Sequence, residues 1–264
     1  MRAVDGFVER KEPGGIAWVR DDFSALPLDR LWQPLEALGG AKGRGGIGTM
    51  ELAQGLVAVV RPLRRGGALA GLLGDRYPGP SRVHAELAML VAMRQRGVPV
   101  VTPLAAAARR KGAFWQLRLF TELEAGAIPL PAFVAAHPGD RAWAIDAAAV
   151  AVRLGFSAGL DHPDLHPDNI LVARRGDRIR AVLVDLDKAK LRPSLTPRQV
   201  DVMLVRMARY LWKHRKRLPA TPSAADLMRF LRGLGLDRAG RREAWQRLDP
   251  KLRRAVAARG LRWR

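Results

Sequence analysis

The sequence predicts an α+β protein with two lobes: a small β-rich N-terminal lobe that carries one helix, and a mostly α-helical C-terminal lobe. In the first third of the chain, short apolar runs of strand length alternate with turn residues. From about residue 130 onward, apolar residues recur at helical spacing, and a stretch of loop, strand, turn and strand interrupts them between residues 161 and 187. We therefore expect an N-lobe over residues 1–122 and a C-lobe over residues 123–264.

The N-lobe is expected to form a small sheet with one helix. The helix is predicted to begin near Ser81, a typical N-cap residue, and to end at Gly97, because Val83 and Leu87 recur at helical spacing. It carries one acid near its middle, Glu86. The predicted strands span residues 15–20, 49–54, 56–62, 101–107 and 114–122.

The C-lobe is expected to consist of helices around one pair of strands. Apolar residues have helical spacing over residues 140–156, 196–217 and 223–259. Between the first two helices, strands are predicted over residues 170–173 and 179–184, with a tight turn between them.

The composition excludes several classes of protein. Of the 264 residues, 48% are hydrophobic and 27% are charged, which is ordinary for a globular protein and argues against wholesale disorder. The chain has no cysteine, so disulfides, thiolate metal ligands and thiol nucleophiles are all excluded. Lysine and arginine number 46 against 25 acidic residues, and the net charge of +21 will attract phosphates, nucleic acid or an anionic membrane surface.

Two segment types that direct a chain to or through a membrane are not expected. Residues 1–15 carry several charges and no apolar core, which is unlike a secretory signal. No uncharged apolar run approaches the roughly 20 residues that span a bilayer. We therefore expect a cytoplasmic chain whose contact with a membrane, if it has one, is peripheral.

One short segment carries the chemistry. A loop presents Asp164, Asn169 follows five positions later at the start of a strand, and the next strand leads into Asp185. Because a tight turn joins the two strands, Asn169 and Asp185 should lie close together, with Asp164 nearby. Phosphoryl transfer uses such a group, in which one carboxylate accepts the hydroxyl proton and oxygen ligands hold Mg²⁺ on the nucleotide phosphates. The alternative, acidic residues that only solvate a turn, does not account for the spacing.

This segment resembles two elements of the protein kinases. Residues 162–172 are similar to the catalytic loop H-R-D-x-x-x-x-N and its following strand, and residues 184–187 are similar to the D-F-G element, with Asp187 in place of glycine. The resemblance implies a bilobal protein-kinase-like fold.

A kinase also needs a loop that covers the phosphates of ATP. Gly43, Gly45, Gly46 and Gly48 lie between strand candidates, where a glycine-rich loop would present backbone N–H groups to the phosphates. A flexible hairpin is the alternative explanation for these glycines.

The strand over residues 56–62 would carry a lysine in a protein kinase, but here it offers Arg61. Arginine is permanently charged and can bind phosphate or a carboxylate through two hydrogen bonds. We therefore predict an ion pair between Arg61 and Glu86, and an exposed surface pair is the alternative. Residues 119–122, at the junction of the lobes, would form the hinge whose backbone meets adenine, through Thr121 and Glu122.

The segment after the D-F-G-like element bears on the acceptor. A protein kinase holds its peptide substrate with a long activation segment that ends in A-P-E. Here fewer than a dozen residues separate Asp187 from the next helix candidate, and A-P-E does not occur. The sequence therefore favours a small or lipid-linked acceptor.

A larger set of segments carries a further resemblance: residues 61–67, 72–77, 81–82, 162–168 and 184–188. Together they resemble the Kdo kinase (3-deoxy-D-manno-octulosonic acid kinase) family, among the lipopolysaccharide kinases of Gram-negative bacteria. The resemblance implies ATP-dependent phosphorylation of the 4-hydroxyl of a Kdo residue on Kdo-lipid A, at the cytoplasmic face of the inner membrane. It implies Asp164 as the catalytic base, Asn169 and Asp185 as Mg²⁺ ligands and Glu86 as the helix acid.

An anionic glycolipid substrate would also account for the positive charge. Residues 206–217 hold six lysines or arginines and no acid, and residues 238–264 hold ten against two acids, with Trp245 and Trp263 among them. Such helices could lie on an anionic membrane with their aromatic residues at the interface. A solvated face of an arginine-rich protein is the alternative.

Two other functions remain open at this point. Another small-molecule kinase, acting on an aminoglycoside or a sugar, would share the catalytic residues, but a cationic acceptor needs an acidic pocket that a +21 chain supplies poorly. A pseudokinase that binds nucleic acid would be recognised by binding that weakens steeply with salt. Because Asp164, Asn169 and Asp185 are all present, we expect catalysis and no specific nucleic-acid partner.

Overall fold

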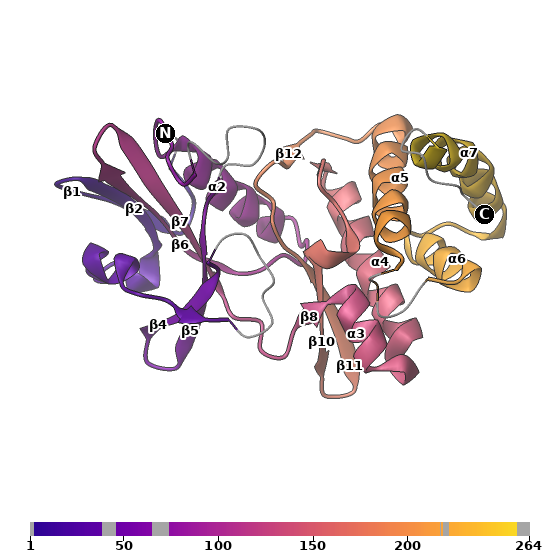
Figure 1. Ribbon diagram of the computed structural model, residues 1–264, viewed down its shortest axis with the longest axis horizontal. Coiled ribbons are helices and arrows are strands. Elements are labelled where there is room, and N and C mark those ends of the chain that lie inside the picture. The colour runs from indigo at the N-terminus through magenta and orange to yellow at the C-terminus, as the bar shows by residue number, and fades with distance from the viewer. Residues whose placement is uncertain (1–2, 39–45, 65–73, 217, 219–221, 258–264) are drawn as a thin grey trace. The chain divides into compact units, whose positions relative to one another are not determined.

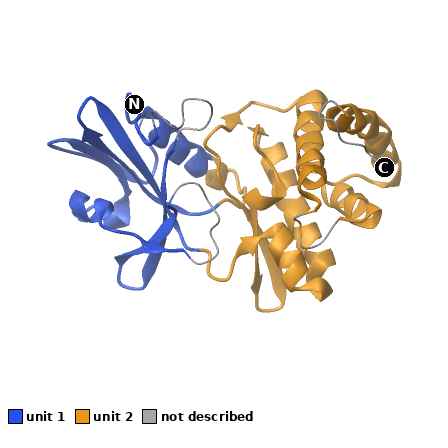
Figure 2. Ribbon diagram, in the orientation of Figure 1, with its two compact units in different colours: residues 1–92, 101–123 blue, residues 93–100, 124–264 orange. Residues whose placement is uncertain are grey.

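The computed structural model of the chain describes residues 3–38, 46–64, 74–216, 218 and 222–257 (Figure 1). Two compact units make up the chain, residues 1–92 with 101–123 and residues 93–100 with 124–264 (Figure 2). Residues 93–100 therefore belong to the second unit, although they lie between two segments of the first.

The first unit is built on an antiparallel seven-stranded sheet with the order β1-β2-β6-β7-β5-β4-β3. Five of its strands confirm the strands predicted from the sequence. The other two, β1 and β3, were not predicted, because β1 is rich in charged residues and β3 has only two residues, and both lie at sheet edges. The strands are β1 (Phe7–Glu12), β2 (Gly15–Arg20), β3 (Glu36–Ala37), β4 (Gly48–Ala53), β5 (Leu56–Pro62), β6 (Pro103–Lys111) and β7 (Phe114–Glu122).

The two faces of this sheet bury different partners. Ala17 and Val19 of β2 join a core with Leu28 and Leu31, which lie on or beside the short 3-10 helix η2 (Leu28–Trp32). Successive side chains of a strand point to opposite faces, so the residue between them, Trp18, faces the other way. There it makes an edge contact with a histidine of helix α2 (Ser81–Gln95), at 4.7 Å between ring centroids. A second short 3-10 helix, η1 (Asp21–Phe23), follows β2.

Helices and two small sheets form the second unit. The three-stranded sheet has the order β11-β10-β8, and β12 pairs with β9 in a separate two-stranded sheet. Helix α4 packs against β11 and α6, and α5 packs against α7. The strands are β8 (Ile128–Pro129), β9 (Leu160–Asp161), β10 (Ile170–Arg175), β11 (Arg178–Leu183) and β12 (Lys190–Leu191). The helices are α3 (Leu130–Ala136), α4 (Arg141–Ser157), α5 (Pro197–His214), α6 (Ala224–Gly233) and α7 (Arg238–Ala257), with 3-10 turns η3 (Pro138–Asp140) and η4 (Pro167–Asn169).

One helical prediction for this unit is wrong. The helix expected over residues 223–259 is two helices, because α6 ends at Gly233 and Gly235 adopts a left-handed backbone with φ 91°. A side chain at Gly235 would also approach the Cδ atom of Arg153 to 3.4 Å. The short helix α3 was not predicted.

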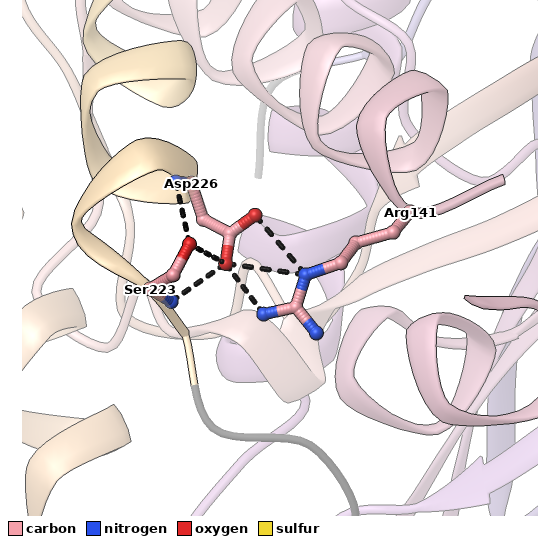
Figure 3. A network of polar contacts seen from close by, with 3 residues as sticks. All are labelled: Arg141, Ser223 and Asp226. Carbon is pink, nitrogen blue, oxygen red and sulfur yellow. Dashed lines mark hydrogen bonds and ion pairs between the residues drawn. The ribbon is translucent and has the colours of Figure 1, made fainter. Parts of the chain in front are cut away.

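Polar contacts fix the start of α6 against α4. Ser223 and Asp226 form a reciprocal capping box, and Arg141 donates hydrogen bonds to the same carboxylate (Figure 3). Burial by itself would raise the pKa of Asp226, but the hydrogen bonds from Arg141 and Ser223 lower it to about 2. The carboxylate is therefore ionised at neutral pH and holds the two helices together. Among the helices in the described ranges, none has the length and apolar character to cross a membrane.

Candidate active site

Asp164 lies in the loop between β9 and η4, and contacts within the loop fix its backbone. Its N–H donates to Nδ1 of His162 at 3.4 Å, and its carbonyl accepts a hydrogen bond from the side-chain amide of Asn169 at 3.0 Å. Both contacts use backbone atoms of Asp164, so they orient the residue without engaging its carboxylate. The loop thus fixes the backbone of Asp164, and neither contact occupies its carboxylate.

Asn169 and Asp185 lie at the same end of the β10–β11 hairpin. Ile170 pairs with Leu183 in the ladder, and the backbone N–H of Val184 donates to the carbonyl of Asn169 at 3.0 Å. Because the Asn169 amide nitrogen is used by the loop, its side-chain oxygen is the atom that can act as a ligand. The structure therefore brings together the three residues predicted to do so, one from the loop and two from the hairpin.

Asp185 has an unusual backbone conformation, with φ 60°. It is the one non-glycine residue with positive φ among the residues that the structure describes. Such a conformation costs of the order of 1 kcal/mol or more and tends to occur at functional sites. The strain falls on one of the two residues predicted to bind metal.

His162 is buried, with 1% of its surface exposed. Burial lowers its pKa to about 4, although the nearby carboxylates of Asp185 and Asp164 act in the opposite direction. The imidazole is therefore neutral at physiological pH, and its Nδ1 can accept the N–H of Asp164.

Helix α5 supports this loop through contacts that the sequence did not predict. Arg206 donates to the carbonyl of Pro163 at 2.5 Å, and the Tyr210 hydroxyl donates to the carboxylate of Asp168. The Tyr210 ring also stacks on that of His166, with centroids 4.4 Å apart and planes 7° from parallel. The available signal was the helical spacing of Arg206 and Tyr210, which places both on one face of α5.

In the first unit, Arg61 and Glu86 form the predicted ion pair, between β5 and α2. The Glu86 side chain is 1% exposed and that of Arg61 is 26% exposed, so the alternative of an exposed surface pair is wrong. Because a buried carboxylate needs a charged partner, the pair links the sheet to the helix.

Two glycines of the glycine-rich segment are described: Gly46 lies just before β4, and Gly48 is the first residue of that strand. Gly46 has positive φ, at 63°. A Cβ at Gly48 would collide with the carbonyl of Glu36 and with Cβ of Leu35, so this glycine has a packing reason as well. Gly43 and Gly45 lie outside the described residues.

Thr121 and Glu122 are the last two residues of β7. The N–H of Glu122 donates to the carbonyl of Thr102, and the N–H of Leu123 donates to that of Val57. The sheet therefore uses both of these donors. The predicted contact with adenine stays a prediction.

The donor chemistry fits a hard cation that is bound together with phosphates. Asn169 offers an amide oxygen and Asp185 offers carboxylate oxygens. Within the described ranges, no group of three or more histidine, aspartate or glutamate side chains could hold a metal by itself. Mg²⁺ is commonly bound by one or two protein oxygens together with substrate phosphates and water. The residues present therefore fit a metal that arrives with a nucleotide.

The loop, the hairpin and the strand-to-helix ion pair define the class as a phosphotransferase with a protein-kinase-like fold. The solved structure of WaaP in complex with acyl carrier protein matches this fold, with a TM-score of 0.57, 20% sequence identity, and coverage of 89% of this chain and 91% of that one. At this identity the likeness bears on the fold, and the fold class predicted from the sequence is confirmed.

The model of the lipopolysaccharide kinase (Kdo/WaaP) family matches residues 29–233, and the chain belongs to that family. A 3-deoxy-D-manno-octulosonic acid kinase of Xylella fastidiosa (strain 9a5c) is 31% identical over 210 residues, which cover 78% of each chain. The enzyme of the same name from Vibrio vulnificus (strain YJ016) is 33% identical over 160 residues, 59% of this chain and 67% of the relative. The resemblance found in the sequence is confirmed, and the chain is a lipopolysaccharide kinase, a phosphotransferase with an alcohol acceptor.

Proposed function

We propose that the protein transfers the γ-phosphoryl group of ATP to the 4-hydroxyl of a Kdo residue on Kdo-lipid A. The observation that carries the proposal is the loop in which Asn169 fixes the backbone of Asp164 and leaves its carboxylate available. The names of the curated relatives supply the acceptor sugar. Family membership disfavours an aminoglycoside or nucleic acid as the substrate.

Asp164 is proposed as the catalytic base. The acceptor hydroxyl donates a hydrogen bond to the Asp164 carboxylate. The hydroxyl oxygen forms a bond to the γ-phosphorus as the bond from phosphorus to the ADP oxygen breaks. The hydroxyl proton passes to the carboxylate. The contacts from His162 and Asn169 to the Asp164 backbone support this role, because they limit the positions that the carboxylate can take.

Asn169 and Asp185 are proposed to hold Mg²⁺ through the Asn169 side-chain oxygen and the Asp185 carboxylate. When bound, Mg²⁺ neutralises charge on the phosphates during transfer. Because the backbone of Asp185 is left-handed, its side chain leaves the chain in a different direction from that of an extended strand residue.

The remaining ATP contacts are proposed in the first unit. Arg61, held by Glu86, supplies a permanent positive charge to the phosphates, in the role of the strand lysine of protein kinases. Thr121 and Glu122 lie at the end of β7, where the hinge is expected to meet adenine; because the Glu122 N–H is used by the sheet, we assign the contact to backbone carbonyls. The loop that covers the phosphates is proposed from the sequence pattern of four glycines: Gly43, Gly45, Gly46 and Gly48.

The protein is also proposed to bind the cytoplasmic face of the inner membrane as a peripheral protein, where Kdo-lipid A is exposed to it. The basic residues within 206–217 and 238–264, with Trp245, supply the charge and the aromatic side chain that an anionic interface attracts. Because this attraction is electrostatic, binding to anionic vesicles should weaken as salt is added.

Transfer of labelled phosphate from Mg-ATP to Kdo-lipid A tests the proposal. In Asp164→Asn both backbone contacts of the loop are kept, so we expect folding to be normal and the transfer rate to fall by about 10²–10⁴-fold. Asp177→Asn is the matched control, because Asp177 is exposed in the turn at the far end of the β10–β11 hairpin. A wild-type transfer rate in Asp164→Asn would contradict the assignment of the base.

A further inference from the structure

A pocket of about 510 Å³ lies beside Asp164, formed entirely by the second unit. Its walls are residues 163–166 of the catalytic loop, Lys188, and the face of α5 that carries Arg206, Arg209 and Lys213. The volume is in the range of sites that bind small molecules. Asp164 contributes to the wall, so a ligand in this pocket meets the proposed base.

The α5 wall is one face of the helix. Its five lining residues occur at positions 206, 209, 210, 213 and 214, which are spaced as neighbours on successive turns. Tyr210 fastens the middle of this face through its hydrogen bond to Asp168 and its stacking on His166. The hydrogen bond from Arg206 to Pro163 fastens its N-terminal end. The cationic wall is therefore in place before a ligand binds.

The charge of the pocket is strongly positive. Four lysines or arginines line it, and Asp164 is the one carboxylate among the lining residues. Within the part of the chain that the structure describes, neither Lys188 nor Lys213 forms an ion pair or a hydrogen bond. Four cations beside a single carboxylate repel one another, and an anionic ligand would lower that cost.

We propose that this pocket is the acceptor site and that Lys188, Arg209 and Lys213 bind the carboxylate of the acceptor sugar. The inference rests on the proposed function, whose acceptor sugar carries its carboxylate and its reacting hydroxyl on the same ring. A pocket with cations on one wall and the base on another holds both groups at once. Cations on this wall thereby choose an acidic sugar and fix which hydroxyl faces Asp164.

Acceptor kinetics of paired variants test this assignment. The double variant Lys188→Gln with Lys213→Gln is assayed with Kdo-lipid A and with a Kdo-lipid A whose carboxyl group has been converted to the amide. The wild type should prefer the acid by about tenfold or more in kcat/KM, as expected for charge-assisted hydrogen bonds, and the double variant should lose this preference. The KM for ATP should stay unchanged.

Lys190→Gln is the matched control, because Lys190 is exposed, lies two positions after Lys188 and does not line the pocket. It should keep the preference for the acid. A double variant that still prefers the acid as the wild type does would overturn the inference. An acceptor that lacks the lipid A phosphates supplies a third arm. One outcome would show that the cations bind phosphate and that the assignment to the carboxylate is wrong. In that outcome, removal of the lipid A phosphates lowers kcat/KM more in the wild type than in the double variant, and the amide acceptor behaves like the acid.

A binding measurement separates failure of this inference from failure of the proposed function. Binding of free Kdo monosaccharide is followed by ligand-observed NMR with the full chain and without ATP. If wild-type protein transfers no phosphate to Kdo-lipid A yet binds Kdo, and the double variant binds it at least about tenfold more weakly, the proposed function fails and the pocket assignment stands. Equal binding by the wild type and the double variant overturns the pocket assignment.

Discussion

Acidification should destabilise this protein through His162. The imidazole is 1% exposed, and burial lowers its pKa from an ordinary value of 6.5 to about 4. In the unfolded chain the same side chain takes up a proton near pH 6.5. Between pH 6.5 and about 4 the unfolded state therefore binds more protons than the folded state. As the pH falls through this range, the free energy of the unfolded state falls relative to that of the folded protein.

The size of the effect follows from the two pKa values. Each pKa unit corresponds to about 1.4 kcal/mol, so a pKa lowered to about 4 removes about 3 kcal/mol of unfolding free energy in total. The stability that depends on a neutral imidazole is fully present above pH 6.5 and is lost as the pH falls toward 4. Protonation would also turn Nδ1 into a donor, which breaks the hydrogen bond from Asp164.

Urea unfolding between pH 7.5 and 4.5, without nucleotide or divalent metal, measures this loss. His162→Asn is the comparison, because a side-chain amide oxygen can accept the Asp164 N–H and does not titrate in this range. The unfolding free energy of the wild type should fall by about 2–3 kcal/mol more than that of the variant. Parallel pH profiles for the two proteins would refute the argument, as would an NMR titration that gives His162 a pKa of 6.5 or above.

Three further changes have defined outcomes. Glu86→Gln removes the charge that holds the strand arginine, and we expect a higher KM for ATP of about tenfold with an unchanged KM for the acceptor, measured by steady-state kinetics. Asp201 is 2% exposed, whereas its partners Arg247 and Lys251 are about half exposed. Replacing both cations with neutral residues leaves a buried carboxylate without a charged partner, and should lower the unfolding free energy measured in urea by about 3 kcal/mol. Asp201→Asn should lower it by less. Gly48→Ala should lower the unfolding free energy by about 1–3 kcal/mol, because the added Cβ collides with backbone, and a change in the thermal midpoint below 1 °C would contradict this.

The arrangement of the three residues proposed for catalysis and metal binding could be predicted because it is local. Asp164 and Asn169 lie in one loop, and Asp185 lies directly after the strand that pairs with the strand after that loop. Spacing along the chain therefore nearly determines their spacing in three dimensions. The pair of Arg61 and Glu86 could be predicted for a different reason. The strand offers one arginine and the helix offers one acid, so each has few alternative partners of opposite charge.

The α5 wall could not be predicted in this way. Arg206 and Tyr210 contact residues 43 and 42 positions earlier in the chain, and no pattern in either segment encodes that pairing. The sequence shows that 206–217 is basic, and this property alone favoured a membrane surface. Docking of α5 beside the loop turns three of these basic residues toward a pocket. The break between α6 and α7 was missed because one left-handed glycine, Gly235, ends a pattern that is otherwise helical.

The basic residues of the chain divide among several uses, and each use takes different residues. Half of the six lysines and arginines within 206–217 line the pocket. On α7, Arg247 and Lys251 pair with the buried Asp201. Each basic residue close to an anionic surface contributes about 1 kcal/mol to membrane binding, so these assignments leave less for the membrane than the sequence suggests. We therefore expect Lys188→Gln with Lys213→Gln to change acceptor affinity far more than binding to anionic vesicles, since the pocket and the membrane surface use different cations.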